Sequence, residues 1–208
     1  MPKISKIITT ALIILGMVAA VIIFKKYFFT SESLEIRLVK ARSKGDAAAP
    51  IKIIEYIDLQ CPACAYGAGI LHKVMDKYPG QIHLEMYYFP LPMHKHTMTA
   101  SYFAECAALQ GDFWPFHDLI LQEQDAWKML EDVRPHFFGI AERCGIDKTK
   151  LDACLNDPAV AERILADKKA GESKGVKSTP TYFINGEMAV GGRGLTDKLT
   201  ALLGSDIL

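Results

Sequence analysis

The hydrophobic positions along the chain follow different patterns in different regions. Residues 7–24 form an uncharged run, IITTALIILGMVAAVIIF, that is apolar on every helical face. Residues 51–59 and 82–89 are short runs rich in β-branched and aromatic side chains, which predict buried strands. Between them, apolar residues spaced three and four apart over 65–78 predict a helix that ends at a Pro-Gly pair. This order predicts a β-α-β unit.

A long helical region and a hairpin follow. From residue 97 to about residue 171 the apolar positions keep helical spacing, which predicts an all-helical insertion. Residues 179–190 read as two short strands about the turn Asn185-Gly186, a pair that favours a hairpin. A final helical segment closes the chain. The sequence therefore predicts an α/β fold that is interrupted by helices.

The N-terminal run is long enough for a membrane span. At about 1.5 Å per residue, its roughly 18 residues approach the roughly 30 Å of the bilayer hydrocarbon. Lys25 and Lys26 follow it in place of the small residues of a cleavage site, which favours an uncleaved anchor. The alternative, a buried globular helix, fits an all-round apolar run poorly. Lysines on both sides of the run leave its orientation open.

These patterns divide the chain into five parts. They are a membrane anchor (1–29), a stalk (30–49), the first part of the α/β fold (50–96), the helical insertion (97–174) and the second part of the α/β fold (175–208).

Composition narrows the function classes. Lys plus Arg and Asp plus Glu both number 24, so the chain has no excess of positive charge. A protein that binds the nucleic-acid backbone needs such an excess, and nucleic acid is therefore not an expected partner.

The main chemical signal is Cys61-Pro62-Ala63-Cys64, placed where the first strand becomes a helix. The first sulfur then lies at a helix N-terminus, where unpaired N–H groups and the helix dipole favour a thiolate. A thiolate attacks disulfides, and Cys61 is the candidate nucleophile. Cys64, one turn further on, can resolve a mixed disulfide. Pro62 suits the first helical turn because no helical partner exists there for an N–H group.

A metal site is the alternative for this motif, because the same spacing supplies half of a zinc site. The chain has no second CxxC and no suitably spaced Cys-His pair. His94 and His96 lie in a Pro-rich connection, where capping or solvated side chains are expected. We therefore expect no metal ligands, and a copper-binding module that uses the CxxC stays as the rival from another class.

Three segments together resemble one family. KGDAAAPIKIIEYIDLQCPAC, QGDFWPFHDLI and GVKSTPTYFINGE are similar to segments of the DsbA-like disulfide oxidoreductases, and the resemblance extends from about Lys44 to the C-terminus. It implies a thioredoxin-like fold with an inserted helical domain. It also implies that Cys61 is the exposed nucleophile with Cys64 as its partner, that Pro180 is a cis-proline facing the disulfide, and that Thr179 offers its backbone to a bound substrate.

The resemblance adds further candidate residues. Glu55 matches an interior carboxylate of the family that assists proton movement at Cys64, and a carboxyl buried there should have a raised pKa. Its alternative is a side chain that points to solvent. Pro62 and Ala63, between the cysteines, are candidate substrate contacts beside Thr179. Ala63, and the pair Lys177-Ser178 before Thr179, depart from the common family pattern and leave the redox potential open.

Three more cysteines, Cys106, Cys144 and Cys154, fall in the helical insertion. A bridge between Cys106 and Cys154 resembles a structural disulfide of some relatives. The alternative is that all three are small buried apolar residues.

The resulting prediction is an oxidase of the bacterial inner membrane. A single N-terminal span would hold the catalytic domain on the periplasmic side, where the Cys61–Cys64 disulfide passes to unfolded or thiol-containing client proteins. No organic cofactor is implied, and a membrane redox partner is expected. A reductase or isomerase of the same fold is the close alternative, because the sequence leaves the direction of electron flow open.

Overall fold

The computed structural model describes residues 12–23 and 36–207. The chain divides into two units, Met1–Leu38 and Val39–Leu208. In the first unit, residues 12–23 are helical with all their side chains exposed. The predicted membrane span extends beyond this helix at both ends, where residues 7–11 and 24 lie outside the described residues. Within the described part of the chain, no helix combines the length and apolar character needed to cross a bilayer.

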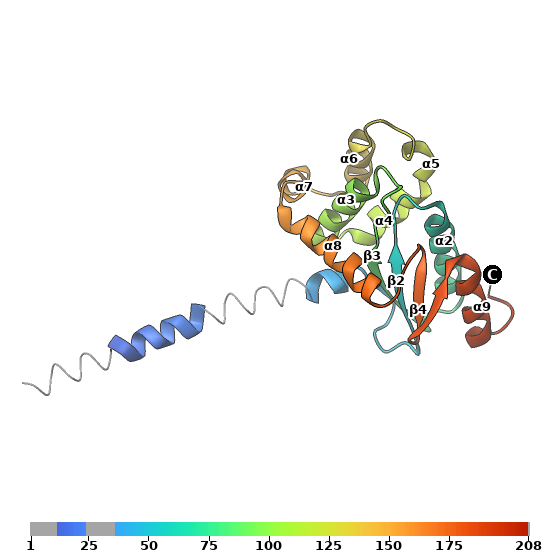
Figure 1. The fold of residues 1–208 in the computed structure, drawn as a ribbon, viewed down its shortest axis with the longest axis horizontal. Coiled ribbons are helices and arrows are strands. Elements are labelled where there is room, and N and C mark those ends of the chain that lie inside the picture. Colours follow the sequence, from blue (N-terminus) through green and yellow to red (C-terminus); the bar gives the residue numbers. More distant parts are fainter. Residues whose placement is uncertain (1–11, 24–35, 208) are drawn as a thin grey trace, which may run out of the picture. The chain divides into compact units, whose positions relative to one another are not determined.

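The second unit is built on a five-stranded sheet of order β1-β3-β2-β4-β5 (Figure 1). The strands are β1 (Ser43–Lys44), β2 (Ile51–Ile57), β3 (Ile82–Tyr88), β4 (Thr181–Ile184) and β5 (Glu187–Val190). Strands β2 and β3 are parallel, and the other neighbouring pairs are antiparallel. The helices of this unit are α2 (Pro62–Lys77), α3 (Thr97–Gln110), α4 (Phe113–Gln122), α5 (Gln124–Trp127), α6 (Arg134–Arg143), α7 (Lys148–Leu155), α8 (Pro158–Ser173) and α9 (Gly191–Leu203).

The predicted α/β class, the β2-α2-β3 unit and the β4-β5 hairpin are confirmed. Asn185 and Gly186 form the hairpin turn, and both have positive φ, at 49° and 87°. A two-residue turn of this kind needs such backbone angles, and Asn and Gly adopt them most readily. The turn chemistry in the sequence therefore sets the register of the last two strands.

Strand β1 falls inside the segment predicted as a stalk. Ser43 and Lys44 pair antiparallel with Glu85 and Leu84 of β3, and the Ser43 carbonyl accepts a 2.9 Å hydrogen bond from the Trp114 indole. These two residues therefore belong to the sheet. The pattern did not reveal them because a two-residue edge strand is too short to show alternation.

The main apolar core lies between the sheet and helices α2 and α9. Residues 51 and 53 of β2, Leu71 and Val74 of α2, and Leu195 of α9 belong to one buried cluster. Because side chains alternate along a strand, Glu55 faces the same side as residues 51 and 53, toward α2. The fold thus directs a carboxyl into the layer that also holds Cys64.

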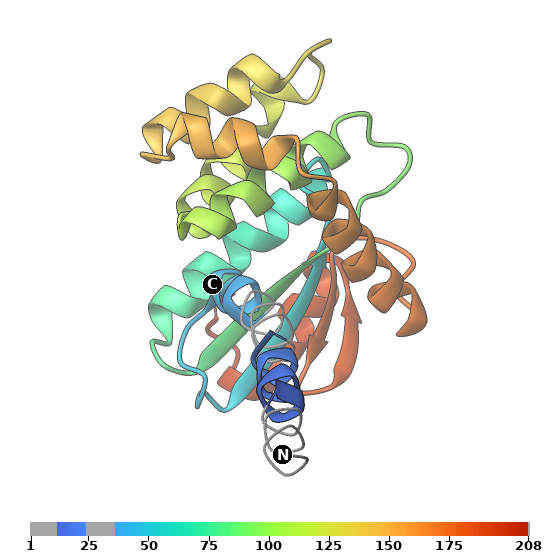
Figure 2. The ribbon, with the colours of Figure 1, turned by 90° about the vertical axis from the view of Figure 1, so that its left-hand side faces the viewer.

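The helices after β3 gather beyond one end of the sheet, while α8 runs back along it (Figure 2). Gly171 of α8 lies against the rings of Tyr56 and Phe89, where a Cβ atom would come within 2.8 to 2.9 Å of ring carbons. Glycine at this position therefore lets α8 approach the second face of the sheet closely.

Candidate active site

The CxxC cysteines lie where β2 gives way to α2. Cys61 is the N-cap of α2, with extended backbone angles, and Pro62 opens the helix. The backbone N–H groups of Cys64 and Ala65 donate to the Cys61 carbonyl at 3.0 and 3.3 Å. The first N–H groups of a helix have no earlier helical carbonyl to bond, so they favour negative charge beside them. The Cys61 sulfur is at that position.

Cys61 is more enclosed than the exposed nucleophile that the resemblance implies. It is 7% exposed, whereas Cys64 is 0% exposed. The Cys61 Sγ lies 3.5 Å from the backbone carbonyl oxygen of Thr179, and the peptide bond between Thr179 and Pro180 is cis. The Pro180 carbonyl accepts a 2.8 Å hydrogen bond from the Gly191 N–H group. This loop covers the first sulfur but leaves it the more accessible of the two.

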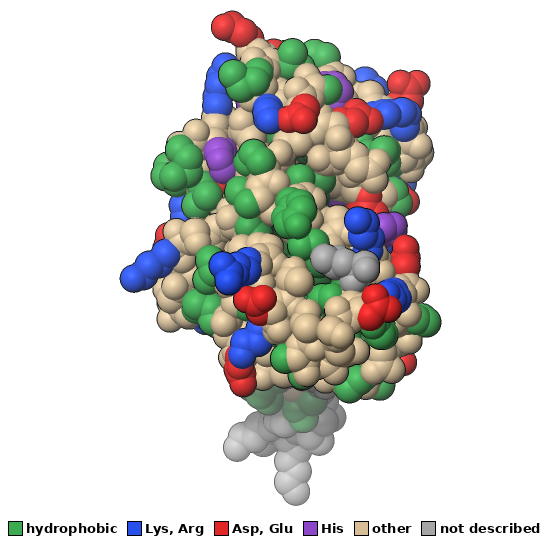
Figure 3. Space-filling view, turned by 90° about the vertical axis from the view of Figure 1, so that its right-hand side faces the viewer, with side chains coloured by type: hydrophobic (Ala, Val, Ile, Leu, Met, Phe, Trp, Pro, Cys, Tyr) green, Lys and Arg blue, Asp and Glu red, His purple; other side chains and the backbone are tan. Residues whose placement is uncertain are grey.

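The surface beside the motif offers both apolar and charged groups. Pro62 and Ala63 are exposed between the two cysteines. Tyr66 on α2 is 66% exposed and Val190 at the end of β5 is 51% exposed. Figure 3 shows apolar side chains interspersed with charged ones on the side that carries α2 and α9. Such a surface can contact an extended polypeptide of mixed sequence.

The pKa values of the two thiols are shifted in opposite directions. The pKa of Cys61 is lowered from 9.0 to about 5, first by the hydrogen bond with the Cys64 side chain, while burial acts in the opposite direction. Thr179 and the backbone N–H groups of Ala63 and Cys64 lower it further. Burial raises the pKa of Cys64 well above 9.0, and the nearby Cys61 adds to that rise. Cys61 is therefore a thiolate at neutral pH, and Cys64 holds its proton.

Glu55 lies in the interior beneath the cysteine pair. It is 1% exposed, and burial raises its pKa from 4.5 to about 7, an effect that the nearby Tyr182 hydroxyl partly offsets. Its charge also raises the pKa of Cys64. Among the described residues, Glu55 Oε1 and the Tyr182 hydroxyl lack a hydrogen-bond partner of standard geometry. A carboxyl with this pKa can both give and take a proton near neutral pH.

A buried carboxylate fixes the corner that leads into the motif. Asp58 is 1% exposed and accepts 2.8 Å hydrogen bonds from the N–H groups of Gln60 and Leu91. Its Oδ2 also lies 2.8 Å from His94 Nδ1. The loop after β3 is thereby tied to the end of β2. The sequence pattern does not reveal Asp58, because two of its three partners, Leu91 and His94, are more than 30 residues away along the chain.

Helix α5 contributes a second support that the sequence did not reveal. The Gln124 amide donates to the carbonyls of Leu59 and Cys61 at 3.0 and 3.2 Å. Gln124 is 4% exposed, so these bonds form in the interior. The helical insertion thus contacts the backbone of the nucleophile itself.

Of the two histidines of the H-x-H segment, His94 is partly exposed and His96 is buried. His94 contacts Asp58, and His96 is 5% exposed with its Nε2 2.7 Å from the Leu130 carbonyl. His96 occupies the N-cap position of α3, but its side chain makes no capping bond. Within residues 12–23 and 36–207, no group of three or more His, Cys, Asp or Glu side chains is arranged to hold a metal ion.

The remaining cysteines separate into a bonded pair and a free thiol. Cys106 of α3 and Cys154 of α7 form a disulfide with a Cα–Cα distance of 5.8 Å, which is the pairing that the resemblance implies. Cys144 is a half-buried free thiol. Burial raises its pKa.

The sequence of this chain is similar to a known protein family and to segments of longer proteins. A family model described as Thioredoxin matches residues 38–201. The Na(+)/H(+) antiporter NhaA of Herminiimonas arsenicoxydans is 33% identical over 143 residues, which are 69% of this chain and 22% of that protein. The chain thus spans about a fifth of the length of the curated relatives it matches.

Solved structures share the fold. The alpha-DsbA1 protein of Wolbachia pipientis is 28% identical, with a TM-score of 0.61 over 69% of this chain and 73% of that one. Oxidised BdbD of Bacillus subtilis is 20% identical, with a TM-score of 0.67 over 80% of this chain and 95% of that one.

Proposed function

This chain belongs to the thioredoxin family, and we propose that it is a thiol-disulfide oxidoreductase of the DsbA type that donates a Cys61–Cys64 disulfide to client proteins. The difference in acidity between the two thiols carries the proposal. A stabilised Cys61 thiolate stabilises the reduced form, and a stable reduced form makes the disulfide a stronger oxidant.

The exchange has two steps. A client thiolate attacks Cys61 Sγ, which forms a mixed disulfide and breaks the Cys61–Cys64 bond, and Cys64 leaves as a thiolate that takes up a proton. A second client thiolate then attacks the client sulfur and releases Cys61 as a thiolate. The client loses two thiol protons and gains a disulfide. Cys64 keeps one proton and the other goes to solvent, while the protein gains the two electrons.

The surrounding residues have distinct parts in this proposal. Glu55 supplies the proton to Cys64. Burial places the pKa of Glu55 near 7, and its charge raises the pKa of the Cys64 thiol. Thr179 and Pro180 present backbone beside Cys61, where an extended client segment can lie. Pro62 and Ala63 are exposed next to the attacked sulfur, so they contact the same client.

We also propose the cellular arrangement that the sequence suggests. The segment 1–29 anchors the chain in the bacterial inner membrane, the residues between it and β1 form the connection, and the catalytic domain lies on the periplasmic side. The oxidase needs a partner in the same membrane that reoxidises Cys61 and Cys64. The uncharged run of residues 7–24 supports this arrangement. Recovery of the full chain in the soluble fraction of lysed cells would contradict it.

The experiment that tests the direction of transfer is a reduction potential. The full chain in detergent is equilibrated with glutathione buffers, and the redox state of the CxxC pair is followed, with Cys64→Ser as the control. We expect a value nearer to the roughly −120 mV of a strong dithiol oxidase than to the roughly −270 mV of thioredoxin. A potential near that of thioredoxin would make the protein a reductase. Stoichiometric retention of copper without exchange would favour a metal-binding module.

A further inference from the structure

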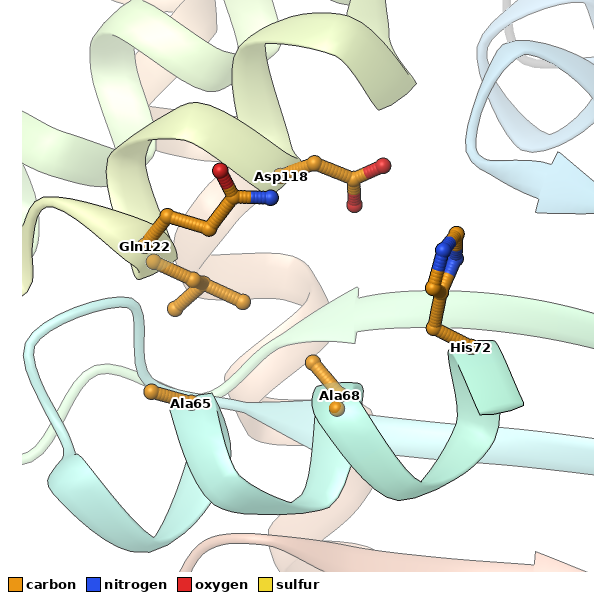
Figure 4. A pocket seen from close by; sticks show the side chains of 7 residues that line it. Ala65, Ala68, His72, Asp118 and Gln122 are labelled. Carbon is orange, nitrogen blue, oxygen red and sulfur yellow. The ribbon is translucent and has the colours of Figure 1, made fainter. Parts of the chain in front are cut away.

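A groove lies between α2, which carries the cysteines, and α4 of the helical insertion. Its volume is about 140 Å³. Figure 4 shows His72 on α2 and Asp118 on α4 at its two sides. The lining residues are Ala65, Ala68, Gly69, His72, Asp118, Leu121 and Gln122. The groove is partly open, so solvent reaches both side chains.

A smaller cavity shares part of its lining with this groove. Its volume is about 20 Å³, and it shares Ala68, His72 and Asp118 with the groove. Its inner lining includes Glu55 and His117, two buried side chains that can carry a proton. The cavity therefore connects the interior carboxyl of the active site with a surface that solvent can reach.

His117 is held firmly in this lining. It is 2% exposed, and its ring lies 5.5 Å from the ring of Phe113 and 5.1 Å from that of Trp114. Its Nδ1 lies 2.9 Å from Asp118 Oδ1. Its Nε2 is buried and has no hydrogen-bond partner among the described residues. One ring nitrogen is thus oriented by a carboxylate while the other is free to exchange a proton.

Glu55, which also lines this cavity, shows the same feature. Its Oε1 is buried and, in the described part of the chain, has no hydrogen-bond partner of standard geometry, although the Tyr182 hydroxyl is nearby. Buried polar atoms are rarely left without a partner, and a cavity of this size with several polar side chains in its lining accommodates about one water molecule. Such a water can bond both Glu55 and His117.

We propose that the His117–Asp118 pair is the proton relay of Glu55, passing protons through one water molecule between the groove and the interior. The proposal rests on the oxidoreductase function given above. When Glu55 gives a proton to the leaving Cys64 thiolate, the water gives one to Glu55 and takes one from His117. His117 regains a proton through Asp118, whose carboxylate lines the groove and receives that proton from solvent. During reoxidation the same transfers run in reverse, so no proton is gained or lost overall.

The charges around His117 suit this role. Asp118 lies beside it on α4, Lys44 enters from β1, His72 from α2 and Glu55 from β2. Burial raises the pKa of Asp118, but the hydrogen bond and charge of His117, together with Lys44 and His72, outweigh burial and lower it. Asp118 therefore stays ionised and holds the His117 ring in one orientation.

The test compares single-turnover oxidation of a dithiol peptide by the disulfide form of the full chain across a range of pH. His117→Gln and His117→Asn keep a polar group but cannot relay a proton, and each is expected to slow the reaction about tenfold or more and to change its pH profile. Glu55→Gln should cause the same change. The Glu55→Gln/His117→Gln double variant should be no slower than either single variant, because both residues act on one path. The equilibrium reduction potential should not change in the His117 variants.

The matched control is His136→Gln. His136 of α6 lies 2.8 Å from the Glu123 carboxylate, so it also forms a His-carboxylate pair, but away from this cavity. If the His117 variants fold poorly, Asp118→Asn removes the orienting carboxylate at a half-exposed position and should slow the same step. An unchanged pH profile in the variant that folds, or losses that multiply in the double variant, would overturn the relay. Failure of the wild-type chain to oxidise the peptide would instead overturn the proposed function.

Discussion

The two cysteine pairs of this protein differ in a way that their spacing alone does not explain. Cys61 and Cys64 are close in sequence, lie at a helix N-terminus and have widely separated pKa values. Cys106 and Cys154 are 48 residues apart and join two helices of the insertion. The first pair has N–H groups aimed at one sulfur, whereas the second closes a long loop. The surroundings of the sulfur atoms therefore separate exchange chemistry from a structural bond.

The largest expected effect is the loss of exchange when the first pair is altered. Cys61→Ser should abolish disulfide transfer, because the remaining thiol of the motif, Cys64, is fully buried and holds its proton. Cys64→Ser should accumulate mixed disulfides with client proteins, which nonreducing electrophoresis detects. Cys144→Ser is the control and should retain transfer. Full turnover by either CxxC variant would contradict the mechanism.

Removal of the second pair should affect stability while transfer is retained. In the chain-entropy treatment, a disulfide that closes a loop of this length stabilises the fold by about 4 kcal/mol. The Cys106→Ala/Cys154→Ala variant should lose about that much free energy of unfolding in urea titrations. If this variant also lost peptide oxidation while folded, the two pairs would not have separate roles.

The carboxyl beneath the first pair should make stability depend on pH. The folded pKa of Glu55 is raised from 4.5 to about 7, so protonated Glu55 favours the folded state, and that contribution is lost as pH rises from about 4.5 to 7. Glutamine does not titrate, so Glu55→Gln does not lose this contribution. Between pH 4 and pH 8, the unfolding free energy of the variant minus that of wild type should therefore rise by about 3 kcal/mol.

Urea titrations of the oxidised protein at several pH values measure this difference. The control is Glu162→Gln, which removes an exposed carboxylate of α8. A pH-independent difference between Glu55→Gln and wild type would show that Glu55 has no raised pKa.

The smallest expected effect concerns two glycines of α2. Gly67 lies against the Tyr182 hydroxyl, and a Cβ atom there would overlap it. Gly67→Ala should therefore lower the free energy of unfolding by about 1–3 kcal/mol, as overpacked cores do. Gly69 has open space around its Cα, so Gly69→Ala should raise it by about 0.5–1 kcal/mol. Thermal unfolding shows whether each substitution lowers or raises stability. Equal changes in stability for the two variants would disprove the close approach of Tyr182 to Gly67.

Much of the sheet follows from local patterns, whereas the supports of the site do not. Strands β2 and β3 and helix α2 have clear periodicity, and Asn185-Gly186 marks the hairpin. Gln124 and His117 gave no comparable signal. Gln124 bonds backbone carbonyls more than 60 residues earlier in the chain, a relation that only the folded structure creates.

His117 stands among Phe113, Trp114 and Phe116, so its segment resembles plain apolar core. The unusual feature in the sequence is a His-Asp pair on a largely apolar helix. Its position beside Glu55 depends on the packing of α4 near β2 and α2, which only the folded structure shows.

The Gln124 amide has a consequence for protein engineering. One side chain from a four-residue helix holds the carbonyls on both sides of Gln60, and it belongs to the inserted helices and not to the sheet. Exchange of the insertion for one that lacks an amide at this position would remove these two hydrogen bonds even if every strand were preserved. A chimera that retains the amide should keep its reactive thiol aligned, so this contact constrains the recombination of the insertion with the sheet.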